Sequence, residues 1–281
     1  VIPISSRALI NCLVTLRSLN PFDMRAKLSF RALSITLLQT FSYKIEICTF
    51  ASLDFRLNCK ETHMGYRKEF DEIRPYRDQE VPTVIERLKQ DPAFFTMMKF
   101  VHPDWSEEHI NETITGISTV AGFQEKVAYP SMRILIDKTV KTVTISGLEN
   151  LKARKSHLFI SNHRDIILDS GILNVALVEA NYGTIYTAIG NNLLSSNLIT
   201  DLTKLNKNFV VKRNTTAREF YENSILLSAF INYTIIDLQN SIWIAQREGR
   251  TKDGLDKTQP GLLKMLSINC DKEFRECFKD L

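Results

Sequence analysis

The stretch that decides the fold is Val143-Thr-Ile-Ser-Gly-Leu-Glu149 and, after eight intervening residues, Leu158-Phe-Ile-Ser-Asn-His-Arg-Asp165. A short apolar run ends in Ser161-Asn162-His163 and so places an imidazole at the carboxyl end of a strand. Open α/β sheets bind their ligands at that edge. A histidine there can act as a general base, because imidazole ordinarily titrates near neutral pH. Asp165 and Asp169 are both close enough in sequence to orient the ring.

Two later segments have the same form. Phe209-Val-Val-Lys-Arg213 and Ile242-Trp-Ile-Ala-Gln-Arg-Glu-Gly-Arg250 are apolar runs that end in cationic residues. Strands alternating with helices predict an α/β fold, with a mostly parallel or mixed sheet flanked by helices. The expected strands are 142–146, 157–161, 184–189, 208–212 and 241–245, and the expected helices are 166–181, 192–205, 216–238 and 258–268.

Residues 66–140 predict a small helical region before the sheet. Asp78 can cap a helix near Val81, and the Asp91-Pro92 pair and Ser106 can each begin another helix. We expect the Phe and Met residues of this region to pack in a core. His102 and His109 lack the acidic partner and strand end that accompany His163, so we interpret both as structural or exposed.

The first 63 residues differ from the remainder of the 281-residue chain. They contain eight Lys and Arg against four Asp and Glu and lack glycine, so the net charge of +4 belongs to this segment. A charged sequence of ordinary composition follows Met64. We expect residues 1–63 to be a non-native extension separate from the sheet; a segment that lies on the membrane surface is the alternative. Five scattered cysteines favour reduced thiols in the cytosol.

The three strand-end motifs together resemble those of the glycerophospholipid acyltransferases. Asn162-His163 with Asp169 resembles the first motif, Phe209 to Arg213 the second, and Glu248-Gly249 in its basic setting the third. The resemblance covers about residues 143–265, and the fourth motif, an apolar stretch around a proline, is not found before Leu281. It implies that residues 141–281 form an α/β acyltransferase domain, truncated at its C-terminus, after a helical region at 64–140.

The resemblance implies that His163 is the general base and that Asp169 orients its ring. In the family the acid lies five residues after the histidine, whereas position 168 here is Leu. Either the turn holds one extra residue and Asp169 returns to the imidazole, or Asp165 has that role. We favour Asp169, because an acid at position 165 can serve as a helix cap.

A phosphate-bearing acceptor needs cationic side chains, and arginine can bind phosphate through two hydrogen bonds. For any single cation among the candidates, a solvated surface charge is the default interpretation, and Glu248 could instead form a structural salt bridge. Arg164 and Lys252 are further candidates. The candidate substrate-binding residues are Lys212, Arg213, Glu248, Gly249 and Arg250.

The activity that the resemblance implies is transfer of an acyl group, in phospholipid synthesis, to a hydroxyl of glycerol 3-phosphate or lysophosphatidic acid. Acyl-CoA or acyl carrier protein would be the thioester co-substrate, with no cofactor, metal or nucleic acid. We expect a cytoplasmic protein, peripheral at the membrane surface. Two alternatives stay open: a hydrolase that uses the same His/Asp pair with water, and a non-catalytic lipid-binding relative.

Overall fold

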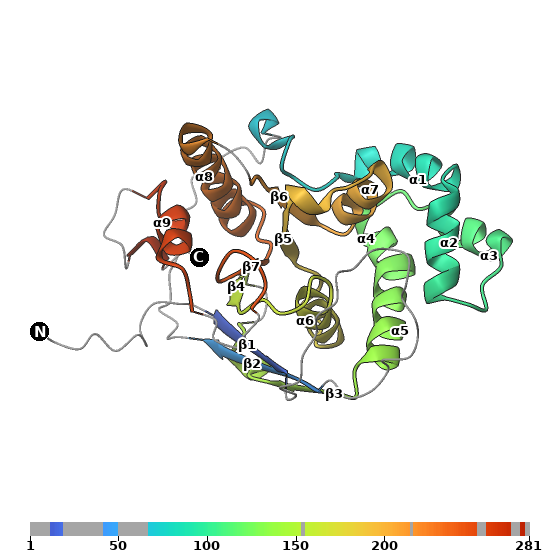
Figure 1. Ribbon diagram of the computed structural model, residues 1–281, viewed down its shortest axis with the longest axis horizontal. Coiled ribbons are helices and arrows are strands. Elements are labelled where there is room, and N and C mark those ends of the chain that lie inside the picture. Colours follow the sequence, from blue (N-terminus) through green and yellow to red (C-terminus); the bar gives the residue numbers. More distant parts are fainter. Residues whose placement is uncertain are drawn as a thin grey trace, which may run out of the picture.

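A seven-stranded sheet lies at the centre of the computed structural model, which describes residues 12–18, 42–49, 67–152, 155–213, 216–251, 257–270 and 276–278. The strand order is β3-β2-β1-β4-β7-β5-β6 (Figure 1). The strands are β1 (Cys12–Ser18), β2 (Ser42–Thr49), β3 (Thr142–Ser146), β4 (Leu158–Ser161), β5 (Tyr186–Gly190), β6 (Asn208–Val211) and β7 (Ile242–Ala245).

The sheet is mostly parallel, as predicted. Among the described strands, only β1 and β2 pair antiparallel. Strands β4, β7, β5 and β6 therefore run in one direction, and their carboxyl ends meet at one edge of the sheet. We call this the carboxyl edge. Strand β3 runs the opposite way, so its end lies at the other edge, away from the segments that follow β4, β6 and β7.

The helices after the strands lie close to their predicted positions. They are α6 (Leu168–Glu179), α7 (Asn197–Leu205), α8 (Ala217–Asn232) and α9 (Pro260–Leu266). Helix α8 ends earlier than predicted, because the backbone continues as a π-helical turn, Tyr233–Asp237. Thr216 begins α8 with a capping box.

The two faces of the sheet are covered by different helices (Figure 1). Ile160 and Ile244 pack on the side of α8 and α9, with Phe230. Phe159 and Trp243 point to the opposite face and pack with α6. Successive side chains of a strand alternate between faces, and all four residues of β4 are buried. This double coverage explains why β4 and β7 are continuously apolar.

The helical region before the sheet has its own core. Phe94 and Met98 are buried there, as predicted, and Leu205 of α7 joins them. Asp91 and Ser106 cap their helices through side-chain oxygens. The helices are α1 (Val81–Lys89), α2 (Pro92–Val101), α3 (Glu107–Ile114), α4 (Val120–Phe123) and α5 (Tyr129–Thr139), with a π-helical turn, Gln124–Ala128, before α5.

Three single-residue predictions have clear outcomes in this region. Asp78 does not cap α1: its carboxylate accepts a hydrogen bond from the backbone N–H of Val120, 2.8 Å away. His102 is structural, because its ring is buried, bonds Ser131 and stacks on Trp105. His109 packs edge-on against that same Trp105 ring.

The expectation that residues 1–63 lie apart from the sheet is wrong for two pieces of that segment. β1 pairs with β4, and β2 pairs with β3, so the two strands lie inside the sheet between β3 and β4. Ile45 is buried against the core on the α6 side. Whether the segment is native, and whether a domain boundary falls at Met64, stay predictions, and Met64 lies outside the described residues.

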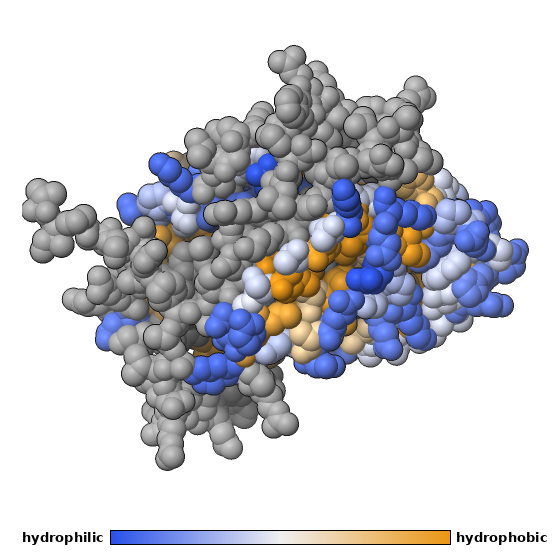
Figure 2. Space-filling model, turned by 90° about the horizontal axis from the view of Figure 1, so that it is seen from below, coloured by the Kyte–Doolittle hydropathy of each residue, from blue (hydrophilic) through white to orange (hydrophobic). Residues whose placement is uncertain are grey.

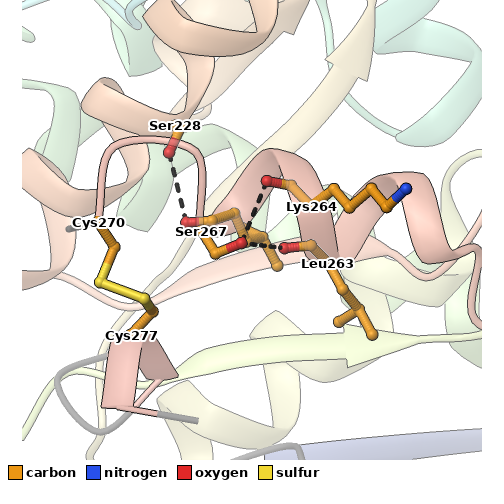
Figure 3. Close-up of a disulfide and its surroundings, with 7 residues drawn as sticks. Ser228, Leu263, Lys264, Ser267, Cys270 and Cys277 are labelled. Atoms are coloured by element: carbon orange, nitrogen blue, oxygen red, sulfur yellow. Dashed lines mark hydrogen bonds between the residues drawn. A yellow bond between two sulfur atoms is a disulfide. The ribbon is translucent and has the colours of Figure 1, made fainter. Parts of the chain in front are cut away.

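The prediction of reduced thiols is wrong for Cys270 and Cys277, which form a disulfide (Figure 3). Their Cα atoms are 5.7 Å apart, within the usual range for a disulfide. Two hydrogen bonds lie near this disulfide: the hydroxyl of Ser228 donates to the carbonyl of Leu266, and that of Ser267 donates to the carbonyl of Leu263 in its own helix. The remaining cysteine side chains lie outside the described part.

The molecule carries both polar and apolar surface on the face seen in Figure 2, where a band of apolar residues lies between hydrophilic groups. Strand β3, at the edge of the sheet, alternates between exposed and half-buried residues. Thr142, Thr144 and Ser146 are exposed, whereas Val143 and Ile145 are half-buried against the core.

Within the described ranges, every helix is too short or too polar to cross a bilayer.

Candidate active site

His163 and Asp169 meet at the carboxyl edge. Nδ1 of His163 lies 2.9 Å from Oδ2 of Asp169. The histidine side chain is 17% exposed and the carboxylate is fully buried. Because a carboxylate can only accept, Nδ1 carries the proton of the neutral ring and Nε2 carries the basic lone pair. The pair therefore has the geometry of a general base with an orienting acid.

The carboxylate in contact with the imidazole belongs to Asp169, as the favoured alternative requires, and its role in catalysis stays a prediction. Oδ2 of Asp169 also accepts from the backbone N–H groups of Arg164, at 2.6 Å, and Asp165, at 3.0 Å. One oxygen thus holds both the ring and the turn that carries it. Asp169 lies in the first turn of α6, where the helix dipole favours negative charge. The turn after His163 is one residue longer than the family spacing, as we expected.

Asp165 has the capping role predicted for it. Its Oδ1 accepts from the backbone N–H groups of Ile167 and Leu168, both at 2.8 Å, at the entrance to α6. These bonds satisfy donors that a helix start leaves without partners. Asp165 therefore stabilises the turn, and its carboxylate is committed to backbone groups.

Two residues that support His163 were not predicted. Trp243 of β7 lies against the imidazole, with the ring centroids 5.8 Å apart and nearly perpendicular. Its indole N–H donates to the hydroxyl of Ser161, 2.9 Å away, and Ser161 is fully buried. The pairing of β4 with β7 places Trp243 beside Phe159, within reach of Ser161 two residues further on. Only the register of two strands distant in sequence reveals this contact.

The turn after β7, which carries the third motif, is hydrogen-bonded to the first motif. The N–H of Gln246 donates to the carbonyl of Ser161 and that of Thr251 to the carbonyl of His163, both at 2.7 Å. Gly249 has a φ of +72°, in the left-handed region that favours glycine. The structure therefore gives Gly249 a conformational role in a turn that is held against His163.

Arg213 contacts the turn after β7, which also carries the third motif. It follows β6, yet its Nε lies 3.8 Å from Oε1 of Glu248, in the turn after β7. Its backbone N–H donates to Oδ1 of Asn191, 3.0 Å away. In the strand order, β5 and β7 lie between β6 and β4. The guanidinium group thus reaches across β5 to the turn that bonds the His163 carbonyl.

The other candidate binding residues are arranged differently. Lys212 points away from Arg213 and Glu248 and forms an ion pair with Glu72. The hydrogen bond and the charge of Lys212 lower the pKa of the Glu72 carboxyl. Arg250 is exposed in the turn after Gly249. Lys252 lies outside the described residues. The structure pairs His163 with Asp169 and Arg213 with Glu248, and the binding roles of all the candidate residues stay predictions.

A comparison with protein families identifies the same part of the chain. Residues 142–249 match the model of the family described as Acyltransferase. This segment is similar to acyltransferases. It runs from β3 to the turn after β7 and contains all three motifs. No curated protein matches the chain. The match supports an acyltransferase enzyme, with an acyl donor and an acceptor as its substrates.

The acyltransferase-like segment contains side chains suited to acyl transfer from a thioester to an alcohol. A base must take the proton of the acceptor hydroxyl, and the acceptor must be held in place. Within the segment, the structure places the His163–Asp169 pair at the carboxyl edge, where a base is predicted. Arg213 supplies a cation that follows β6, three strands from β4, and lies beside Glu248 in the turn after β7.

Proposed function

We propose that this protein transfers a fatty acyl group from an acyl thioester to a hydroxyl of glycerol 3-phosphate or lysophosphatidic acid. The donor would be acyl-CoA or acyl carrier protein. The observation that carries the proposal is the His163–Asp169 pair at the carboxyl edge, inside the segment that matches the acyltransferase family. The roles of the individual residues follow from the chemistry of the reaction.

In this reaction, Nε2 of His163 takes the proton of the acceptor hydroxyl while the oxygen attacks the thioester carbonyl carbon. Asp169 keeps the proton on Nδ1 and stabilises the imidazolium that forms. The tetrahedral intermediate then collapses, the carbon–sulfur bond breaks, and the imidazolium returns its proton to the leaving thiolate. The products are an ester and a free thiol, and no covalent acyl-enzyme is required.

Arg213 would hold the acceptor phosphate. Its ion pair with Glu248 is long, at 3.8 Å, and the glutamate side chain is 69% exposed. A pair of this kind contributes little to stability. A phosphate could therefore replace Glu248 as the partner of the guanidinium, since charge-assisted bonds from arginine to phosphate are shorter and geometrically specific. Arg250 would extend this basic group, and Lys212 would join it on leaving its ion pair with Glu72.

The carboxyl edge would also contact the membrane. In the described residues five large apolar side chains are exposed, and Ile166, Ile167, Phe220 and Tyr221 lie just after β4 or β6, whereas Phe100 belongs to α2. Exposed apolar side chains near a lipid-handling site can enter the interfacial region of a bilayer. The enzyme would then work as a peripheral protein on the cytoplasmic surface.

The test of the activity is a transfer assay with wild type and His163→Ala, using acyl-CoA or acyl carrier protein with glycerol 3-phosphate or lysophosphatidic acid. A general base contributes about 10²–10⁴-fold in rate, so the variant should lose measurable turnover while its circular dichroism stays unchanged. Near-normal turnover by His163→Ala would contradict the assignment. Release of free fatty acid without acceptor acylation would favour the hydrolase.

The membrane contact has a matched test in sedimentation with vesicles of phosphatidylcholine and phosphatidylglycerol. The variant Ile167→Ser/Phe220→Ser should bind at least about tenfold more weakly, since an apolar contact of one such side chain contributes roughly 1.5–3 kcal/mol. Phe100→Ser removes an equally exposed ring elsewhere and should bind as wild type does. Equal losses for the two variants would contradict a docking surface at this edge.

A further inference from the structure

Gly190, the last residue of β5, lies directly beside the side chain of Arg213. A Cβ atom at position 190 would lie 2.9 Å from Nε and 3.1 Å from Cζ of Arg213, and 2.5 Å from Oδ1 of Asn192. Real Cβ atoms essentially never approach other heavy atoms more closely than about 3 Å, because dense packing leaves no such overlap. The guanidinium group therefore occupies space that only a glycine leaves open.

The backbone does not require a glycine at this position. Gly190 has φ −71° and ψ 137°, an extended conformation that any residue adopts. Gly249, in contrast, has a φ of +72° and no neighbour near its Cβ position. Glycine at 190 is thus explained by the close approach of Arg213 and Asn192, and not by a turn.

The residues after Gly190 hold the same arginine from its backbone. Oδ1 of Asn191 accepts the N–H of Arg213, at 3.0 Å. Residues 190 and 211 are partners in the pairing of β5 with β6, so the two strands end side by side. The segment Gly190-Asn191 therefore fixes both where Arg213 begins and the path that its side chain follows toward Glu248.

We propose that Gly190 and Asn191 are positioning residues that direct Arg213 to the turn after β7, which is hydrogen-bonded to the His163 carbonyl, and that they thereby set the affinity for the phosphate of the acceptor. This inference rests on the proposed function, since it takes Arg213 to be the phosphate ligand. Three strand spacings of about 4.8 Å separate β4 from β6, roughly 14 Å in all. Arg213 covers part of this distance, because its side chain crosses the end of β5 at position 190 and reaches Glu248 in the turn after β7.

The test is Gly190→Ala, with apparent KM measured separately for acceptor and thioester donor. The added methyl group should displace the guanidinium and raise the acceptor KM about tenfold, as expected for weakening one charge-assisted interaction. The donor KM and kcat should stay within about twofold. The atoms that must move are side-chain atoms, so the urea midpoint should change little. Asn191→Ala should act in the same direction.

Gly261→Ala is the matched control. A Cβ at position 261 meets no atom within 4 Å, and this exposed residue lies on α9, away from Arg213. The same substitution there should leave both KM values unchanged. A similar rise in acceptor KM for Gly261→Ala would overturn the inference, because the effect would not depend on the contact with Arg213.

The double variant Gly190→Ala/Arg213→Ala separates a positioning role from a general structural one. If Gly190 acts through Arg213, adding Gly190→Ala to Arg213→Ala should change the acceptor KM no further, so the two effects should not add. Additive losses, or a normal acceptor KM for Gly190→Ala alone, would overturn the inference. If Arg213→Ala itself leaves the acceptor KM unchanged, the proposed phosphate site fails, and that result is distinct from a failure of Gly190 alone.

Discussion

Replacing Asp169 by Asn tests the pairing at the centre of the site with almost no change in shape. In the wild type, Oδ2 accepts from the His163 ring and from the N–H groups of Arg164 and Asp165. An asparagine oxygen can still accept all three bonds, but it carries no charge. Oδ1 of Asp169 is buried and makes no hydrogen bond to any described residue. The amide NH₂ that replaces it would also have no acceptor there.

The expected loss of activity follows from the charge. Hydrogen bonds to a charged group contribute about 1.5–3 kcal/mol and neutral ones about 0.5–1.5 kcal/mol. Losing about 1.4 kcal/mol of imidazolium stabilisation lowers kcat about tenfold. If the amide turns its NH₂ toward the ring, the histidine takes the other tautomer, and the loss approaches the full contribution of a general base, about 10²–10⁴-fold. We therefore expect Asp169→Asn to lower kcat at least about tenfold.

Asp165→Asn is the matched control, because it makes the same chemical change four residues away. Asp165 accepts from the N–H groups of Ile167 and Leu168, and asparagine caps helices about as well as aspartate does. Its kcat should stay within about twofold of wild type. Both variants should be compared in the acyl-transfer assay at saturating substrate. A larger loss for Asp165→Asn than for Asp169→Asn, or no loss for Asp169→Asn, would refute the reasoning.

Three further predictions concern stability in urea unfolding. Thr216→Ala removes the side-chain cap of α8 and should lower the free energy of unfolding by about 1 kcal/mol, with Thr216→Ser close to wild type. Cys270→Ser removes the disulfide and should lower the free energy of unfolding by about 2 kcal/mol without reductant. With reductant present the variant and the wild type should have nearly the same stability. Burial, and then the charges of Lys138 and His109, lower the pKa of His102. As pH falls, His102 is therefore protonated in the unfolded state before it is protonated in the folded state. The free energy of unfolding should decrease as pH falls from about 6.5 through the folded pKa, and it should decrease less in His102→Gln.

Local signals explain what could be predicted from the sequence. The strands β4 and β7 are short apolar runs buried on both faces, and the caps at Asp91 and Ser106 need only the residues that follow them. The contact between His163 and Asp169 could be predicted from the first motif alone, because the two residues are only six positions apart in the chain. Such features depend on backbone preferences over a few residues, and those preferences survive in the fold.

Contacts between distant strands explain what was missed. Strand β1 joins the sheet by pairing with β4, and strand β2 joins it by pairing with β3. The sequence of residues 1–63 did not predict either strand, because basic residues interrupt its apolar residues. The bond from Trp243 to Ser161 depends on the register between β4 and β7. Neither register can be read from either segment alone, because a shift of one residue would turn every side chain to the other face.

The strand order also gives the motifs an arrangement that their order in the chain conceals. Along the chain the first motif is followed by the second and then the third, but β7, which carries the third, lies between β4 and β5. Glu248 is therefore nearer to His163 than the second motif is, and Arg213 must cross the end of β5 to reach it. That crossing is possible because residue 190 has no side chain. The identity of Gly190 is thus a consequence of sheet topology, which connects a residue outside all three motifs to the proposed phosphate site.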